Sequence, residues 1–381
     1  MRTIGTIIIA LLLLTACRHD ELVSFITEET THGAVSHTDI CGLYVLNEGN
    51  MGSNKCTLDY LDLSDDSQGE SHYYRNIYGA RNPNTVMELG DVGNDIAIYG
   101  DKLWMVINCS NKVEVCEART ARRIGQVNIA NARYLAFDDG FAYVSSYAGP
   151  VQIAENTALG RVYKVDTLTL QKVDSVTVGY QPEEMAIADG LLYVANSGGY
   201  RVPHYDNTVS VIDLHRMEVT HTLQTEVNLH RLKIDRHGTL WISSRGNYLD
   251  HAPALCWIAQ NGETGRIDRA VSDMDLVGDT LYCIGSAFDI RSGQYRRDMF
   301  VVDVRTKTCP ETTLFEDPAV QGMTMPYGII VNPRDKDIYL MDAKNYVSSG
   351  ELLHLQPDGH VDWKVRTGDI PSSACFLITK K

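Results

Sequence analysis

Tyrosines and cationic side chains are the residues of this sequence whose types best suit ligand binding. The chain of 381 residues has 20 tyrosines against 7 phenylalanines. A tyrosine offers an apolar ring and a polar hydroxyl to a large amphipathic molecule, and arginine pairs with phosphate or carboxylate groups. The candidate binding residues are Tyr78, Arg81, Arg133, Tyr147, Gln181, Glu183, Tyr200, Arg201, His204, Tyr205, His230, Arg231, Arg245, Tyr248, Tyr295, Tyr327 and Tyr346.

Signatures of catalysis and of metal binding are weak in this sequence. It contains no G-x-S-x-G and no H-E-x-x-H, and no C-x-x-C of the kind found in zinc sites. An acid pair such as Glu183 with Asp273 is an alternative that would suit a hydrolase or calcium, although no spacing supports it. We therefore expect a binding protein without catalytic residues, cofactor or metal. The alternatives are an extracytoplasmic hydrolase or lactonase-like enzyme and a protein-interaction or adhesin module.

A repeated strand pattern indicates which elements position these residues. An aromatic residue followed by alternating apolar residues recurs seven times, with Tyr44, Trp104, Tyr143, Tyr193, Trp241, Tyr282 and Tyr339 in the same slot. The copies span 42–50, 102–110, 141–149, 191–199, 239–247, 280–288 and 337–345. A period of about 48 residues indicates stacked β-units. Each copy is interpreted as strand B, the second from the axis, of one blade of a β-propeller.

The strands around each copy predict how the ring closes. A period-two pattern after each copy predicts strand C, and a pattern before six of the seven predicts the innermost strand A. Residues 371–379 match the missing A strand of the first blade, so the C-terminus would pair with that blade and remove a free sheet edge. The expected fold is all-β, a seven-bladed β-propeller over 40–381 closed by the C-terminal strand.

The connections between strands predict that one face of the propeller carries the site. The A–B turns are minimal, as at Asp139-Gly140 and Asp189-Gly190. The B–C connections are long and rich in Tyr, Arg and His, and they span 146–160, 196–207, 244–253, 286–297 and 342–350. Because blade strands alternate in direction, the B–C and D–A connections share one face. Function concentrates in such loops, and the polar residues that begin the A strands should surround the axis there.

The first residues predict export and a lipid anchor. Arg2 precedes an apolar stretch, Ile4 to Leu14, which is too short to span a bilayer. Leu14-Thr15-Ala16-Cys17 resembles the bacterial lipobox, in which the cysteine is acylated. We expect a lipoprotein signal peptide at 1–16, and the lipidated Cys17 with a flexible tether at 17–39. The expected location is the outer membrane, lipid-anchored at the cell surface.

The net charge excludes one class of binding partner, and the positions of the cysteines bear on whether disulfides form. A formal net charge of −15 argues against nucleic acid, which needs a basic surface. Two cysteine pairs, Cys41 with Cys56 and Cys109 with Cys116, flank hairpins in which a disulfide is possible. Cys256, Cys283 and Cys375 occupy apolar strand slots, in which a free cysteine behaves as a small hydrophobe. The sequence therefore leaves open whether the cysteines form disulfides or remain free thiols.

Two segments carry a family resemblance. LYVANSGG at 192–199 with NTVSVIDLHRMEV at 207–219 resembles the repeat of YncE-like seven-bladed propellers. GLYVLNEGNMGSNKCTLDYLDL at 42–63 resembles the opening blade of Bacteroides-type surface lipoproteins, including the BtuG type. The resemblance implies capture of cobalamin or another corrinoid as a ligand, and delivery to a TonB-dependent outer-membrane transporter. No short signature transfers the ligand contacts residue by residue, and fold alone does not fix function.

Overall fold

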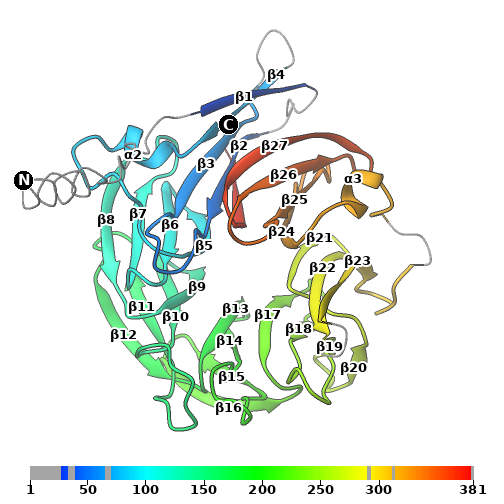
Figure 1. The fold of residues 1–381 in the computed structure, drawn as a ribbon. Coiled ribbons are helices and arrows are strands. Elements are labelled where there is room, and N and C mark those ends of the chain that lie inside the picture. Colours follow the sequence, from blue (N-terminus) through cyan, green and yellow to red (C-terminus); the bar gives the residue numbers. More distant parts are fainter. Residues whose placement is uncertain (1–26, 33–38, 65–69, 290–292, 311–313, 379–381) are drawn as a thin grey trace, which may run out of the picture.

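The computed structural model describes residues 27–32, 39–64, 70–289, 293–310 and 314–378. Seven antiparallel sheets stand around a central axis, and the chain passes from blue to red once around the ring (Figure 1). The predicted all-β, seven-bladed propeller is confirmed. No helix among the described residues combines the length and the apolar character needed to cross a membrane.

Blade one contains both ends of the described chain. Its strands, from the axis outward, are β28 (Pro371–Ile378), β2 (Ile40–Asn47), β3 (Thr57–Asp62), β4 (Glu70–Arg75) and β1 (Thr27–His32). β28 pairs antiparallel with β2, so that Tyr44 lies opposite Cys375. The predicted closure by the C-terminal strand is therefore confirmed.

The other six blades follow in chain order. Blade two has β5 (Gly93–Tyr99), β6 (Lys102–Ile107), β7 (Lys112–Glu117) and β8 (Arg123–Asn128), and blade three has β9 (Ala132–Asp138), β10 (Phe141–Ser146), β11 (Arg161–Asp166) and β12 (Lys172–Thr177). Blade four has β13 (Pro182–Ala188), β14 (Leu191–Asn196), β15 (Thr208–Asp213) and β16 (Glu218–Gln224), and blade five has β17 (Leu229–Ile234), β18 (Leu240–Ser244), β19 (Ala254–Ile258) and β20 (Thr264–Ile267). Blade six has β21 (Asp273–Val277), β22 (Thr280–Asp289) and β23 (Gln294–Asp303), and blade seven has β24 (Pro326–Val331), β25 (Ile338–Asp342), β26 (Ser349–Leu355) and β27 (Val361–Asp369).

Two segments differ from the sequence expectation. Within the expected tether, Thr27–His32 forms β1, which pairs with β4 from Thr27 opposite Arg75 to His32 opposite Glu70. An outer strand can recruit this polar segment because its backbone groups are otherwise unpaired. The expected B–C connection at 286–297 is instead mostly strand, because β22 and β23 continue their pairing as far as Asp289 opposite Gln294. The lipobox and Cys17 lie outside the described residues.

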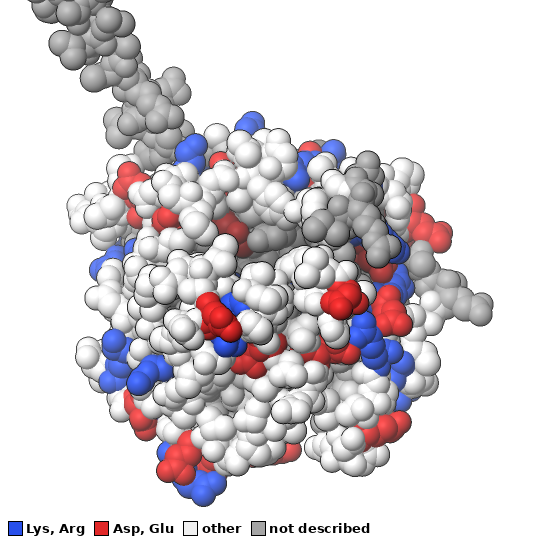
Figure 2. Space-filling model, turned by 60° about the horizontal axis from the view of Figure 1, so that its bottom comes forward, with Lys and Arg blue, Asp and Glu red and all other residues white. Residues whose placement is uncertain are grey.

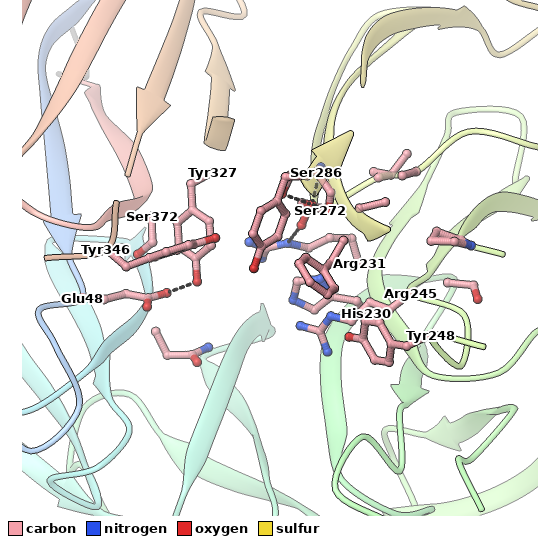
Figure 3. A pocket seen from close by; sticks show the side chains of 18 of the residues that line it. Glu48, His230, Arg231, Arg245, Tyr248, Ser272, Ser286, Tyr327, Tyr346 and Ser372 are labelled. Atoms are coloured by element: carbon pink, nitrogen blue, oxygen red, sulfur yellow. Dashed lines mark hydrogen bonds between the residues drawn. The ribbon is translucent and has the colours of Figure 1, made fainter. Parts of the chain in front are cut away.

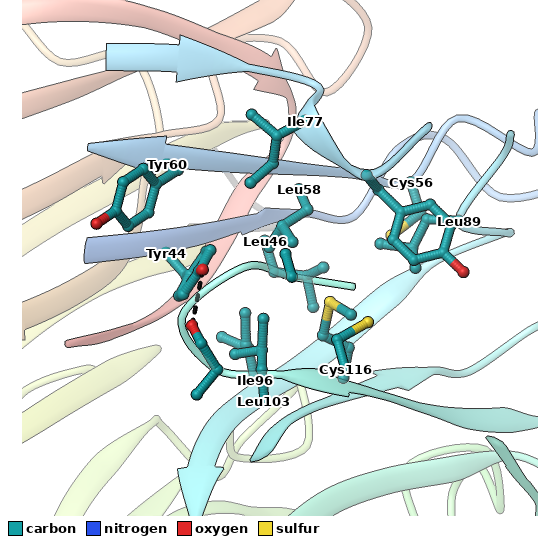
Figure 4. Close-up of a cluster of buried hydrophobic side chains, with 14 of the residues drawn as sticks. Tyr44, Leu46, Cys56, Leu58, Tyr60, Ile77, Leu89, Ile96, Leu103 and Cys116 are labelled. Carbon is teal, nitrogen blue, oxygen red and sulfur yellow. Dashed lines mark hydrogen bonds between the residues drawn. The ribbon is translucent and has the colours of Figure 1, made fainter. Parts of the chain in front are cut away.

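The core lies between neighbouring blades. Tyr44, Leu46 and Leu58 of blade one pack with Ile96 and Leu103 of blade two (Figure 4). Burying such apolar side chains contributes about 1.5–3 kcal/mol each. The repeated aromatic slot forms part of this packing, since Trp104, Trp241 and Tyr339 are almost wholly buried. The repeat therefore reflects inter-blade packing.

The predicted turns are also present. Asp139 and Gly140 both have positive φ, 43° and 80°, the conformation that a tight two-residue hairpin requires. Asp166 and Asp213 accept hydrogen bonds from backbone N–H groups of the turns that follow them, at 2.7–3.0 Å. These aspartates cap the turns that follow them.

Two further features of the fold are the state of the cysteines and the distribution of charged residues on the surface. The eight cysteines in the described part of the chain are free thiols. On the face shown in Figure 2, Lys and Arg lie in small groups among Asp and Glu, and much of the surface carries neither.

Candidate functional site

One pocket lies near the axis on the face of the B–C connections, and we call it the axial pocket (Figure 3). It encloses about 270 Å³. The starts of β9, β17 and β24 supply Arg133, Arg231 and Tyr327, and the B–C connections supply Glu48 and Arg245. Inner strands begin and B–C connections emerge on the same face because the strands are antiparallel. The topology therefore gathers residues from distant blades around one cavity.

Glu183 binds two of the arginines at the pocket. Its Oε2 accepts two hydrogen bonds from Arg133 at 3.0 and 3.1 Å, and its Oε1 accepts one from the Tyr147 hydroxyl at 2.7 Å. Arg245 also reaches Oε1, at 3.4 Å. Burial opposes ionisation of this carboxyl, but Arg133 and Arg245 outweigh that effect and keep its pKa below the ordinary value. Two arginines thus share one carboxylate.

Arg231 is held by a second carboxylate. Its Nε lies 3.0 Å from Asp273 and donates to the carbonyl of Ser272 at 3.2 Å. Asp273 also accepts the backbone N–H of Ile329 at 2.9 Å, which joins blades six and seven. Burial raises the pKa of Asp273 to about 6, although Arg231 opposes the rise. Glu183 and Asp273 are each ion-paired to arginine and do not form an isolated acid pair.

His230 is an uncharged polar group in the same wall. Its Nε2 lies 2.8 Å from the hydroxyl of Tyr134, which also lines the pocket. Burial, followed by the positive charges of Arg245, Arg231 and Arg133, lowers the pKa of His230 well below its ordinary 6.5. The Nδ1 atom of His230 is buried without a hydrogen-bond partner among the described residues. At neutral pH the histidine therefore adds no charge to the arginines.

Three exposed aromatic side chains stand at the pocket, and we call them the aromatic rim: Tyr248, Phe288 and Tyr295. Their exposed fractions are 48%, 44% and 49%, and all three line the pocket. The rings of Phe288 and Tyr295 meet edge to face with centroids 5.2 Å apart. Apolar rings that are exposed together at a pocket are typical of ligand-binding grooves and of partner-binding surfaces.

The opposite wall contains Glu48 and two tyrosines. The Tyr327 hydroxyl donates a hydrogen bond of 3.1 Å to Glu48 Oε1, and the Tyr327 and Tyr346 rings pack edge to face at 5.5 Å. Burial raises the pKa of Glu48 to about 7, while the Tyr327 hydrogen bond and three arginines oppose the rise. This carboxyl therefore changes its charge near neutral pH.

Many of the residues predicted from the sequence converge at this place. The pocket is lined by Arg133, His230, Arg231, Arg245, Tyr248, Tyr295, Tyr327 and Tyr346. Tyr147 and Glu183 lie directly behind Arg133. Tyr200 packs against the Tyr147 ring at 6.2 Å and donates its backbone N–H to the Gln181 side chain.

Three candidates lie in the β14–β15 connection and do not line the pocket: Arg201, His204 and Tyr205. The Arg201 guanidinium covers the Tyr180 ring at 3.7 Å. His204 lies 3.2 Å from the exposed Glu155. These contacts tie the connection to the β12–β13 connection through Tyr180 and to the preceding B–C loop through Glu155.

The structure places Tyr78 and Arg81 away from the axial pocket. Both belong to the short helix α2 (Ile77–Arg81). The Tyr78 hydroxyl donates to the buried Glu114 at 3.1 Å, and Arg81 reaches the carbonyl of Thr120 in the β7–β8 turn. That turn is on the opposite face from the B–C connections, so these two residues do not line the axial pocket, and their role as ligand contacts stays a prediction. These residues lie in the connection between β4 and β5, which as a D–A connection is expected on the face of the B–C connections, but its helix α2 packs against β3.

Several pocket residues were not predicted, notably Glu48, Asn94, Tyr134, Phe288 and Ser372. The repeat itself contains the signal that identifies some of them. Glu48 follows Tyr44 by four positions, and Tyr147 and Arg245 follow Tyr143 and Trp241 by the same four. Glu48 and Arg245 line the pocket, as does Ser286 in the same slot of blade six, and Tyr147 lies behind Arg133, so this slot reaches the pocket in some of the blades.

Comparison with known proteins identifies the family. Residues 41–255 match the family described as a domain of unknown function, DUF5074. The chain belongs to this family. No curated protein matches the sequence of this DUF5074 chain.

Solved structures resemble the DUF5074 chain in fold. A hypothetical selenium-binding protein from Sulfolobus tokodaii matches with a TM-score of 0.61 and 11% identity, over 88% of this chain and 93% of that one. A quinonprotein alcohol dehydrogenase-like protein from Bacteroides thetaiotaomicron matches with a TM-score of 0.58 and 12% identity, over 90% and 79%. Hydrazine synthase from Kuenenia stuttgartiensis matches with a TM-score of 0.60 and 18% identity, over 75% and 95%. At these identities the likeness shows the propeller fold alone.

Proposed function

We propose that this chain is a non-enzymatic propeller that captures a large amphipathic ligand at the axial pocket, and that the ligand is cobalamin or another corrinoid. The observation that supports this is the aromatic rim beside three arginines. Exposed rings bury ligand area with little loss of side-chain freedom. The arginines offer charged hydrogen bonds to an anionic group.

The size of the pocket defines how such a ligand would bind. A pocket that encloses a whole drug-sized molecule has a volume of roughly 300–1,000 Å³, and this one encloses about 270 Å³. A corrinoid is larger than that, so its ring system would lie across the aromatic rim. A smaller part of it, such as the phosphate of its nucleotide loop, would enter the pocket beside Arg245 and Arg231.

The contacts of Glu183 and Asp273 argue against the acid pair that a hydrolase would use. Glu183 is bonded to Arg133 and Tyr147, and Asp273 to Arg231 and a backbone N–H. A general base needs a lone pair directed at the substrate. These carboxylates instead hold the arginines in place.

Location and delivery are part of the same proposal. Acylation of Cys17 would hold the propeller on the outer membrane at the cell surface. From there it would pass its ligand to a TonB-dependent outer-membrane transporter. Co-purification of an outer-membrane transporter with the anchored chain tests the delivery step.

The primary test is a calorimetric titration of the chain from residue 18 onward, which retains every described residue, with cyanocobalamin. We expect saturable one-to-one binding with nanomolar affinity. Absence of both heat and thermal stabilisation at high ligand concentration would overturn the corrinoid assignment.

A further inference from the structure

We infer that Glu48 couples the binding of an anionic ligand group in the axial pocket to the uptake of one proton. The inference rests on the proposed function and deepens it, because it specifies the charge of the group that enters the pocket and the residue that selects it.

The first step is the balance of charge around the cavity. Three guanidinium groups face it, those of Arg133, Arg231 and Arg245. Their ion-pair partners are two carboxylates, since Arg133 and Arg245 share Glu183 and Arg231 pairs with Asp273. In these direct ion pairs the guanidinium groups outnumber their carboxylate partners by one, and Arg245 has the longest contact, at 3.4 Å. An incoming anion would satisfy this excess.

The second step is the place of Glu48. In Figure 3 its carboxyl stands across the pocket from Arg231 and Arg245. It accepts the Tyr327 hydroxyl at 3.1 Å, and its backbone N–H is fixed by the carbonyl of Ile370. Among the described residues, no ion pair joins Glu48 to an arginine. The arginines and this carboxyl thus face the same space without touching, and a ligand anion between them would compete with Glu48 as the counter-charge.

The third step is the state of the surrounding titratable groups. Burial raises the pKa of Tyr327 well above 10 and that of Tyr346 to about 12, and His230 stays neutral. Behind Glu48, burial raises the pKa of the Cys56 and Cys109 thiols. The remaining charged and titratable groups on adjoining elements are Asp91, Asp95, Lys112, Arg133, Tyr134, Glu183, Glu184, Arg231, Lys233, Arg245, Tyr248 and Asp273, of which Glu184 and Lys233 pair with each other at 2.7 Å.

Asp95 and Asp273 set the lowest pH at which a change in binding can be assigned to Glu48. Burial raises the pKa of Asp95 and of Asp273 to about 6, so both are mostly ionised at pH 6.5 and above. The pKa of Glu48, raised by burial to about 7, lies inside the window from pH 6.5 to 8.5.

The sign of the effect follows from these charges. Below pH 7 the protonated Glu48 leaves the arginine excess unbalanced, which favours an anion. Above pH 7 the ionised carboxylate balances the arginines and repels the ligand. When an anion binds at such a pH, a proton moves from solvent to the Glu48 carboxylate. The association constant should therefore fall by as much as about tenfold per pH unit above the pKa.

The test is a titration with cyanocobalamin at pH 6.5, 7.5 and 8.5 and constant ionic strength, in two buffers of different ionisation enthalpy. The phosphodiester of this probe keeps one negative charge throughout that window. We expect wild type to take up a fraction of a proton that grows with pH, and Glu48→Gln to bind with the same affinity at all three values. Glu155→Gln is the matched control, because Glu155 is exposed and does not line the pocket, and it should behave like wild type.

A second variant guards against a folding defect in Glu48→Gln. The Tyr327 hydroxyl lowers the pKa of Glu48, so Tyr327→Phe should move the midpoint of the pH dependence upward. A merely structural role of Glu48 would not produce that shift.

Sodium sulfate provides a second test of the inference, in which the anion is not a corrinoid. At equal ionic strength with sodium chloride, it should raise the melting temperature of wild type more at pH 6.5 than at pH 8.5, and equally at both for Glu48→Gln. If cyanocobalamin binds wild type without pH dependence, the inference fails and the proposed function stands. If cyanocobalamin does not bind but sulfate shows the expected pattern, the corrinoid assignment fails and the inference stands. If neither probe binds, both fail.

Discussion

The hydroxyl of Tyr147 donates a hydrogen bond of 2.7 Å to Oε1 of Glu183. Tyr147 follows the second strand of blade three, and Glu183 begins the inner strand of blade four. This bond crosses the interface between two blades and fixes the carboxylate that holds Arg133 and Arg245. The tyrosine acts on the pocket through Glu183.

Replacing Glu183 should destabilise the fold. Glu183→Gln leaves two arginines without their buried counter-charge, and we expect a loss of about 3 kcal/mol in the free energy of unfolding, as for other broken buried pairs. Urea unfolding measures it. Glu155→Gln, at an exposed pair, should change stability by less than about 0.5 kcal/mol; an equal loss in both variants would contradict the assignment.

The same carboxyl predicts a dependence of stability on acid. The arginines keep the pKa of Glu183 below its ordinary value of 4.5. Its contribution is therefore present above about pH 4.5 and is lost as pH falls through the lowered pKa. Urea midpoints measured from pH 6 down to 3 should decline more in wild type than in Glu183→Gln. Parallel declines would show that other groups dominate.

The aromatic rim should carry binding energy. Truncating either Phe288 or Tyr295 to alanine should weaken cyanocobalamin binding about tenfold or more, as at other aromatic contact residues. The melting temperature should stay near that of wild type, since both rings are about half exposed. Leu168→Ala is the control, because Leu168 is 83% exposed in the turn after β11, on the opposite face.

Tyr78 separates structural tyrosines from binding tyrosines. Tyr78→Phe removes a hydrogen bond to the buried Glu114 and should cost about 1–2 kcal/mol of stability. It should leave cyanocobalamin affinity unchanged. Weaker binding without loss of stability would instead support Tyr78 as a contact residue.

The closing strand should be indispensable. Ending the chain after Ile370 removes β28 and exposes the inner edge of β2. We expect loss of the cooperative unfolding transition and aggregation through that edge, followed by circular dichroism and size exclusion. Removing residues 379–381 alone keeps β28 and should have no effect.

The lipid anchor has a direct test. Cys17→Ser should abolish labelling by a radioactive fatty acid and release the chain from the membrane fraction of the producing bacterium. Cys41→Ser, in a cysteine of the propeller, should be labelled like wild type. Labelling that survives Cys17→Ser would contradict the predicted lipidation site.

The repeated strand pattern alone predicted the blades, and some residues of the axial pocket could be named from it. Equivalent places at or just before the start of the inner strands are occupied by Asn94, Arg133, Glu183, His230, Ser272, Tyr327 and Ser372, and all of these except Glu183 line the pocket. Arg133, Glu183, His230 and Tyr327 were named from the sequence because their side chains are large and polar. Asn94 and Ser372 were missed because a small side chain carries no chemical signal until its position is known.

The sequence by itself determined the number of blades, their strand order and the closure by residues 371–378, because alternating burial repeats with the period of the blade. The tertiary structure decided which side chains meet. It brought Glu48 of blade one opposite Arg245 of blade five, kept Glu183 and Asp273 on separate arginines, and turned Tyr78 and Arg81 away. These outcomes depend on contacts between blades far apart in sequence, and on helix packing outside the repeat, which strand periodicity does not encode.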